Sequence, residues 1–192
     1  MAKLGREGGH ERHADAVVVG NLLISLLRHT DRVHSASLAQ LVNVIAPIMT
    51  EPGGPAWKQT TFHPFALTSR YARGNVLEVP ITSPTYDTAK YGTVPLVDAV
   101  ATHDPETGDV ALFLVNRSID GSAPIEVDLG GLGETTLVEA VELSNPDHLW
   151  AASMEDSTSV SPKELAGVSV VDGVLSATLP PVSWAMVRLS SR

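Results

Sequence analysis

Gln40 is the first residue whose type and place could do chemistry. It lies inside the apolar run of residues 38–48, where a buried side-chain amide costs free energy unless it is hydrogen-bonded. In α/β barrels, ligands bind at the C-terminal ends of the strands. An amide there could donate to and accept from the hydroxyl groups of a ligand. A structural amide bonded to nearby backbone is the alternative, and the residues alone favour it.

Trp57 is a second candidate binding residue. It follows a stretch rich in glycine and proline, residues 50–57, which must form a loop. An indole face in such a loop could stack on a sugar ring, although a tryptophan that anchors the loop is at least as common. Asn43 is favoured as structural, because three residues along an extended strand it would face away from Gln40.

The remaining polar clusters do not indicate a metal site or a catalytic pair. His10 and His13 lie three apart in a polar N-terminal segment, which is not the spacing of a zinc-binding helix, so a solvated tail is expected and no metal or other cofactor. Four acids of the C-terminal half alternate with apolar residues and are expected on a solvent-facing surface: Glu126, Asp128, Glu139 and Glu142.

Composition limits the partners. The chain has 192 residues, 43% of them hydrophobic, and a formal charge of −9 without any basic block, so nucleic acid and anionic membranes are disfavoured as partners. It contains no cysteine, which excludes disulfides and thiolate metal sites. Residues 1–12 lack the apolar core of a signal peptide, and the apolar stretch 14–27 is too short to span a membrane. A cytoplasmic globular protein is therefore expected.

The pattern along the chain changes near residue 75. Before it, the periodicity predicts a helix over 14–29, a buried strand within 33–49, a loop, and a helix over 60–72 with Pro64 in its first turn. After it, short alternating runs separated by turn residues predict an antiparallel β-sandwich with strands at 76–81, 96–103, 110–116, 125–129, 135–143, 168–171, 174–179 and 184–189. The first part is either a fragment of an α/β layer or, alternatively, a strand that joins the sandwich and two helices that pack on its face.

Several motifs together resemble the α-L-arabinofuranosidases of glycoside hydrolase family 51. They are LAQLVNVIAPI at 38–48, GGPAWKQT at 53–60, FHPF at 62–65, SPTY at 83–86 with the following residues 87–94, and LVNR at 114–117. The resemblance extends from Ala14 to the C-terminus, whereas the first dozen residues are unrelated to it.

The resemblance implies a fold with three parts. Residues 1–13 would be a disordered or unrelated tail. Residues 14–74 would be the last helix, strand and helix of a TIM-type catalytic barrel, and residues 75–192 a jelly-roll-like antiparallel β-sandwich. Family members also borrow one strand of this sandwich from their N-terminal part, and hexamers are common among them, so a full-length form is expected to be a homo-oligomer.

The resemblance also implies an enzymatic activity for the whole family protein and the absence of that activity from this chain alone. The family hydrolyses terminal non-reducing α-L-arabinofuranosyl groups of arabinan, arabinoxylan and oligosaccharides by a retaining mechanism, which needs two carboxyl groups about 5–5.5 Å apart. Both are glutamates on barrel strands that precede the match to Ala14. The chain is therefore expected to hold no catalytic residue and to be inactive alone. In the family a glutamine at the place of Gln40 contacts the sugar.

A non-catalytic carbohydrate-binding or structural β-sandwich is the competing interpretation. A binding module presents exposed aromatic rings, yet only 5% of the residues are aromatic, and Trp150 and Trp184 lie in or beside predicted strands. The sequence therefore favours the enzyme fragment over the binding module.

Overall fold

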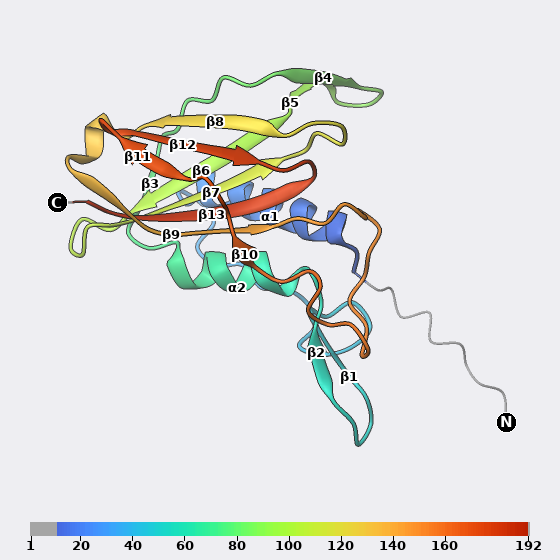
Figure 1. Cartoon of the computed structure of the whole chain (residues 1–192). Helices are drawn as coiled ribbons and strands as arrows, with labels where there is room; N and C mark the ends of the chain where they lie inside the picture. The colour runs from blue at the N-terminus through green and yellow to red at the C-terminus, as the bar shows by residue number, and fades with distance from the viewer. Residues whose placement is uncertain (1–10, 192) are drawn as a thin grey trace, which may run out of the picture.

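The chain folds into three layers. The computed structural model describes residues 11–191. A six-stranded antiparallel sheet forms the central layer, two helices cover one of its faces, and a three-stranded sheet covers the other (Figure 1).

The helical layer consists of α1 (His13–Arg28) and α2 (Phe62–Tyr71), close to the ranges that the periodicity predicts. The Asp15 carboxylate accepts a hydrogen bond from the Arg12 backbone N–H at 2.7 Å, which caps the start of α1. Pro64 occupies the first turn of α2, where its missing N–H costs nothing. Ala72 is the C-cap of α2, and Gly74 lies in the turn to β3 with φ of +73°, where a Cβ atom would lie 2.2 Å from the carbonyl oxygen of His103.

The central sheet has the strand order β10-β9-β13-β7-β6-β3. All neighbouring strands in it are antiparallel, and β13 lies between β9 and β7. Its strands are β3 (Asn75–Leu77), β6 (Val97–His103), β7 (Asp109–Asn116), β9 (Thr135–Leu143), β10 (Lys163–Glu164) and β13 (Ser183–Ser191).

The second sheet has the order β11-β12-β8 and is also antiparallel. It consists of β8 (Ala123–Asp128), β11 (Ser169–Val171) and β12 (Val174–Leu179), and the short 3-10 turn η1 (Gly130–Leu132) follows β8. Two further hairpins are attached to this body: β1 (Ile48–Thr50) with β2 (Ala56–Lys58), and β4 (Thr85–Thr88) with β5 (Gly92–Pro95).

Two hydrophobic cores result from the alternation of side chains in the central strands. In β7, Leu112 and Leu114 face the three-stranded sheet, whereas Phe113 and Val115 face the helices. Trp184 is fully buried in the helix-side core and packs close to α1 at Gly20. The predicted antiparallel sandwich is thus confirmed, and its central sheet is buried on both faces.

The predicted strand within residues 33–49 is wrong. In the structure only Ile48–Thr50 of this range is a strand, and residues 33–47 form turns and irregular backbone. A parallel strand satisfies its backbone groups only between neighbouring strands, and every strand pairing described for residues 11–191 is antiparallel. Residues 33–47 have the apolar pattern of a buried strand, but the described residues contain no strand that pairs with them.

Both helices pack against the central sheet. Ala16, Val17 and Ile24 of α1 are buried in the helix-side core, and Leu67 and Tyr71 of α2 lie against it. This arrangement agrees with the second half of the alternative interpretation, in which the helices cover a face of the sandwich. The fold is therefore an all-β antiparallel sandwich with two helices, and an assignment of residues 14–74 to a barrel remains a proposal.

Candidate functional site

The two predicted binding residues lie on different elements. Gln40 is exposed, in the irregular segment between α1 and β1. Trp57 lies in β2, opposite Met49, with only 9% of its surface exposed. Its indole Nε1 is buried without a hydrogen-bond partner in the described structure. A sugar contact by either residue stays a prediction, and for Trp57 it would require movement of the hairpin.

The segment that carries Gln40 exposes much of its apolar surface. Leu41 is 79% exposed, and Val42, Val44 and Ile45 are also exposed. Val44 has φ of +59°, which is unfavourable for a β-branched residue. Residues 41–45 therefore have the composition of a buried strand, but most of them are exposed and their backbone is irregular.

The end of the same segment is firmly held. The Asn43 side chain donates to Thr50 Oγ1 and accepts from the Thr50 N–H, each at 2.8 Å. Asn43 is thus structural, as the sequence favoured. Ala46 is fully buried, and its carbonyl oxygen accepts a 2.7 Å hydrogen bond from Nε2 of Gln59, whose side chain is also fully buried.

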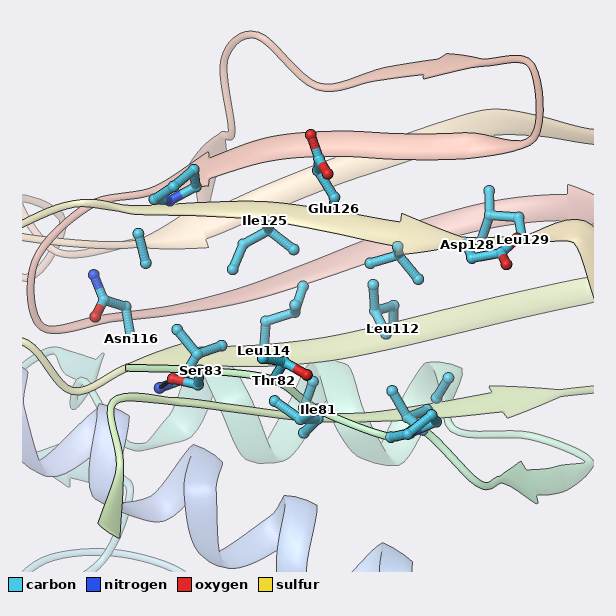
Figure 2. A pocket seen from close by; sticks show the side chains of 18 of the residues that line it. Ile81, Thr82, Ser83, Leu112, Leu114, Asn116, Ile125, Glu126, Asp128 and Leu129 are labelled. Carbon is cyan, nitrogen blue, oxygen red and sulfur yellow. Dashed lines mark hydrogen bonds between the residues drawn. The ribbon is translucent and has the colours of Figure 1, made fainter. Parts of the chain in front are cut away.

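A cavity lies elsewhere, between the two sheets (Figure 2). It has a volume of about 610 Å³ and is lined mainly by apolar side chains, including Leu112, Leu114 and Ile125. Residues 77–84 and β8 line its other sides, and β8 pairs with β12 on one edge only. Neither Gln40 nor Trp57 lines this groove.

Of the four acidic residues expected on a solvent-facing surface, one is buried instead. Glu126 and Asp128 are exposed, and Glu139 pairs with Arg188 at 3.3 Å. Glu142, expected on a solvent face, is 7% exposed and pairs with Lys163 at 3.4 Å. The reason is that β10 and the chain after β9 cover this end of the sheet edge, which the alternation of β9 alone does not reveal.

Two histidines are buried in their neutral form. His13 is fully buried at the start of α1, and its Nε2 lies 2.7 Å from the carbonyl oxygen of Val182. Burial, with the nearby His148 and Lys163, lowers its pKa. Burial and the charge of Lys58 lower the pKa of His63 to about 4. The expected solvated tail is therefore wrong for His13, because α1 begins at this residue, whereas His10 lies outside the described residues.

A charged cluster fastens α1 to the central sheet. Asp98 of β6 is 7% exposed, and its carboxylate accepts from Asn21 Nδ2 at 2.8 Å and pairs with Arg28. Arg117 approaches the same carboxylate at 3.2 Å. Arg28 also donates to the carbonyl oxygen of Ala99. The cluster is structural, since its partners belong to the helix and the sheet that it joins.

The motif at 114–117 also has a structural role. Asn116 is fully buried at the end of β7, and its Nδ2 donates to the carbonyl oxygens of Gly121 and Pro180 at 3.0 and 2.9 Å. Its Oδ1 accepts from the Ser118 N–H at 3.0 Å. The side chain joins two loops, and sequence reasoning missed this role because the partners lie up to 64 residues away.

Within residues 11–191, no group of three or more histidine, cysteine, aspartate or glutamate side chains could hold a metal ion. No helix in the same range is long and apolar enough to cross a membrane.

Comparison with protein families and curated proteins gives a consistent result. A family model described as the α-L-arabinofuranosidase C-terminal domain matches residues 5–183. An intracellular exo-α-(1→5)-L-arabinofuranosidase of Streptomyces lividans is 53% identical over 91% of this chain and 26% of its own length. An exo-α-(1→6)-L-arabinofuranosidase of Bifidobacterium longum is 49% identical over 92% of the chain and 34% of its own length.

Solved structures agree. A family 51 α-L-arabinofuranosidase from Bifidobacterium longum superposes with a TM-score of 0.89 and 45% identity, over 93% of this chain and 35% of that one. A family 51 arabinofuranosidase from Xanthomonas axonopodis superposes with a TM-score of 0.85 and 28% identity, over 94% of this chain and 36% of that one. The chain thus spans about a third of the length of the relatives it matches.

Proposed function

Because this chain belongs to the family 51 α-L-arabinofuranosidases and matches their C-terminal domain, we propose that it is the non-catalytic C-terminal part of such an enzyme. The whole enzyme removes terminal non-reducing α-L-arabinofuranosyl groups from arabinan, arabinoxylan and oligosaccharides. The observation that carries the proposal is the match along more than nine-tenths of the chain to only about a quarter to a third of these relatives.

In this proposal the chain alone is inactive. Retaining hydrolysis requires a nucleophile and an acid/base on opposite sides of the glycosidic bond. Both carboxylates belong to the part of the enzyme that precedes α1. Gln40 contributes hydrogen bonds to the hydroxyl groups of the sugar, and Trp57 lies at the rim of the sugar site.

Exposed apolar side chains support the proposal that a further part of the enzyme packs against this chain. Val18 and Leu22 lie one turn apart on the outer side of α1 and are 57% and 58% exposed. Together with residues 41–45 they form apolar surface that a soluble protein normally covers. In this proposal the rest of the barrel covers it.

The groove between the sheets supports the same proposal. Its apolar lining and the unpaired edge of β8 fit one additional strand. The N-terminal part of the full-length enzyme supplies that strand in this proposal. The enzyme is cytoplasmic, since relatives carry the name intracellular, and it assembles as a homo-oligomer without nucleic acid or membrane partners.

A chimera tests the function directly. The part of the Streptomyces lividans enzyme that precedes its matched region is joined to the complete 192-residue chain, and hydrolysis of an aryl α-L-arabinofuranoside is measured. The chimera should be active and the 192-residue chain inactive. In the chimera, Gln40→Ala should lower kcat/KM roughly ten- to a hundredfold through lost hydrogen bonds, with little change in Tm.

Two results would contradict the proposal. Turnover by the isolated chain that survives repurification would show that it carries its own catalytic groups. A folded chimera without activity would show that this sequence does not replace the C-terminal third of a family enzyme.

A further inference from the structure

Gln59 is a fully buried amide that joins three parts of the chain. Its side-chain Oε1 accepts a hydrogen bond from the Glu11 N–H at 2.8 Å, and its Nε2 donates to the carbonyl oxygen of Ala46 at 2.7 Å. Its backbone N–H donates to the carbonyl oxygen of Pro47 at 2.8 Å. The residues that it joins lie 48 and 13 positions away in sequence.

These bonds fix one end of the segment that carries Gln40. Residues 38–45 are mostly exposed and lack regular structure, whereas Ala46 is fully buried. Two of the three bonds made by Gln59 hold the backbone at 46 and 47. The third ties this point to the residue that leads into α1. The anchor lies six residues after Gln40, so it acts whether residues 38–45 are irregular or extended.

Only an amide of this length can make both side-chain bonds. One end of the group must accept from a backbone N–H and the other must donate to a backbone carbonyl, and a neutral amide does both. A carboxylate would lack the donor, and an apolar side chain would leave the N–H of residue 11 and the carbonyl of the buried Ala46 without these partners. The hydroxyl of the neighbouring Thr60 donates to the carbonyl oxygens of Arg12 at 2.7 Å and of Glu11 at 3.3 Å, and no hydrogen bond is described between it and residues 46–47.

We infer that Gln59 is a positioning residue for the sugar-binding segment: its amide fixes Ala46 and Pro47 against the entry to α1 and so determines where Gln40 meets the substrate. The inference rests on the proposed function, because it requires Gln40 to contact the sugar. Gln59 itself touches no substrate.

The chimera described above provides the kinetic test. Gln59→Leu should lower kcat/KM roughly tenfold or more at a temperature well below Tm, mainly by raising KM, because a small displacement of a binding group is costly. Combined with Gln40→Ala it should add little further loss, since both changes remove the same contact. Thr60→Val, a buried neighbour that ties only the entry to α1, is the matched control and should leave kcat/KM within twofold of the parent.

Three kinetic results overturn the inference. The first is a kcat/KM of Gln59→Leu within twofold of the parent. The second is a double variant with Gln40→Ala whose loss equals the product of the two single losses, and the third is an equal loss for Thr60→Val. If Gln59→Leu fails to fold, Gln59→Glu replaces it, because this change keeps the length and the acceptor but removes the donor to Ala46.

Hydrogen exchange on the 192-residue chain separates this inference from the proposed function. In Gln59→Leu, the amides of residues 11 and 43–50 should lose protection, while those of β7 keep it. An inactive parent chimera would refute the proposed function and with it the effect on substrate. Unchanged protection at residues 11 and 43–50 would refute the anchor itself, whatever the chimera does.

Discussion

Gly20 sets how closely α1 approaches the central sheet. A Cβ atom at this position would lie 2.1 Å from Cδ1 of Trp184, far inside contact distance. Trp184 is fully buried, so neither group can move without disturbing the helix-side core. The helix therefore tolerates a glycine in its interior, where alanine would otherwise be preferred.

We predict that Gly20→Ala lowers the free energy of unfolding by about 1–3 kcal/mol, because overpacking outweighs the gain in helix propensity. Urea denaturation followed by tryptophan fluorescence measures the change. Gly131→Ala is the control, since a Cβ there meets no atom within 4 Å, and it should be close to neutral. A Gly20→Ala variant as stable as the wild type would mean that α1 does not pack on Trp184 as described.

His63 makes the fold sensitive to acid. Its pKa is about 4 in the folded chain, below the ordinary value of 6.5 that it regains on unfolding, so the unfolded state binds more protons between these values. The contribution of neutral His63 to the free energy of unfolding is therefore fully present above about pH 6.5 and is lost as the pH falls through 4. His13, whose pKa is also lowered by burial, acts in the same direction.

The prediction is that His63→Gln flattens the pH dependence of stability between pH 6.5 and 4. Each histidine that must take up a proton contributes a slope of up to about 1.4 kcal/mol per pH unit. Urea midpoints at several pH values measure it. His29→Gln, at the exposed C-cap residue of α1, is the matched substitution outside the buried site. Parallel profiles for wild type and His63→Gln would contradict the buried neutral state of His63.

At the scale of elements, the two faces of the central sheet should respond differently to a larger side chain. Leu114 of β7 is only 1% exposed but lines the cavity between the sheets, whereas Met186 of the neighbouring strand β13 is fully buried against the helices. We predict that Leu114→Phe changes the free energy of unfolding by less than about 1 kcal/mol, while Met186→Phe costs about 1–3 kcal/mol.

Thermal denaturation of the two variants measures this difference. Both changes replace a large flexible side chain with phenylalanine, so each serves as the control for the other. In the active chimera, where an added strand fills the groove, Leu114→Phe should become destabilising as well. Equal costs in the isolated chain would mean that the groove is closed in solution.

At the scale of the whole molecule, the helices and the sheet form one packing unit. α1 covers the face of the sheet that holds Phe113 and Trp184, and Arg28 supplies a partner to the buried Asp98. The alternating pattern from about residue 76 onward, taken alone, predicts a sandwich that stays folded without the helices. The contacts favour the alternative that the sheet needs its helices.

We predict that a chain starting at Gly74 aggregates or unfolds, because it exposes the helix-side core and removes Arg28 and Asn21 from Asp98. Size-exclusion chromatography and circular dichroism of this chain beside the 192-residue chain measure the outcome. A point variant, Asp98→Asn, should lower Tm in the full chain without aggregation. A monomeric, cooperatively folding short chain would instead support an independent sandwich and a separable helical part.

Much of the architecture follows from the sequence by itself. Short apolar runs separated by turn residues predicted the strands of both sheets except β10. Helical periodicity and Pro64 placed α1 and α2 within a residue or two of their bounds. The motifs around Gln40, Trp57 and Asn116 indicated the family, which the comparisons confirm.

Only the tertiary structure decided what each of these residues contacts. Residues 33–47 have the composition of a buried strand, but a strand forms only where other strands satisfy its backbone, and the described chain offers none. His13 and Glu142 look solvated in sequence and are buried because distant segments cover them. The roles of Gln59, Asp98 and Asn116 depend on partners up to 77 residues away, and local pattern carries no information about contacts that chain folding alone creates.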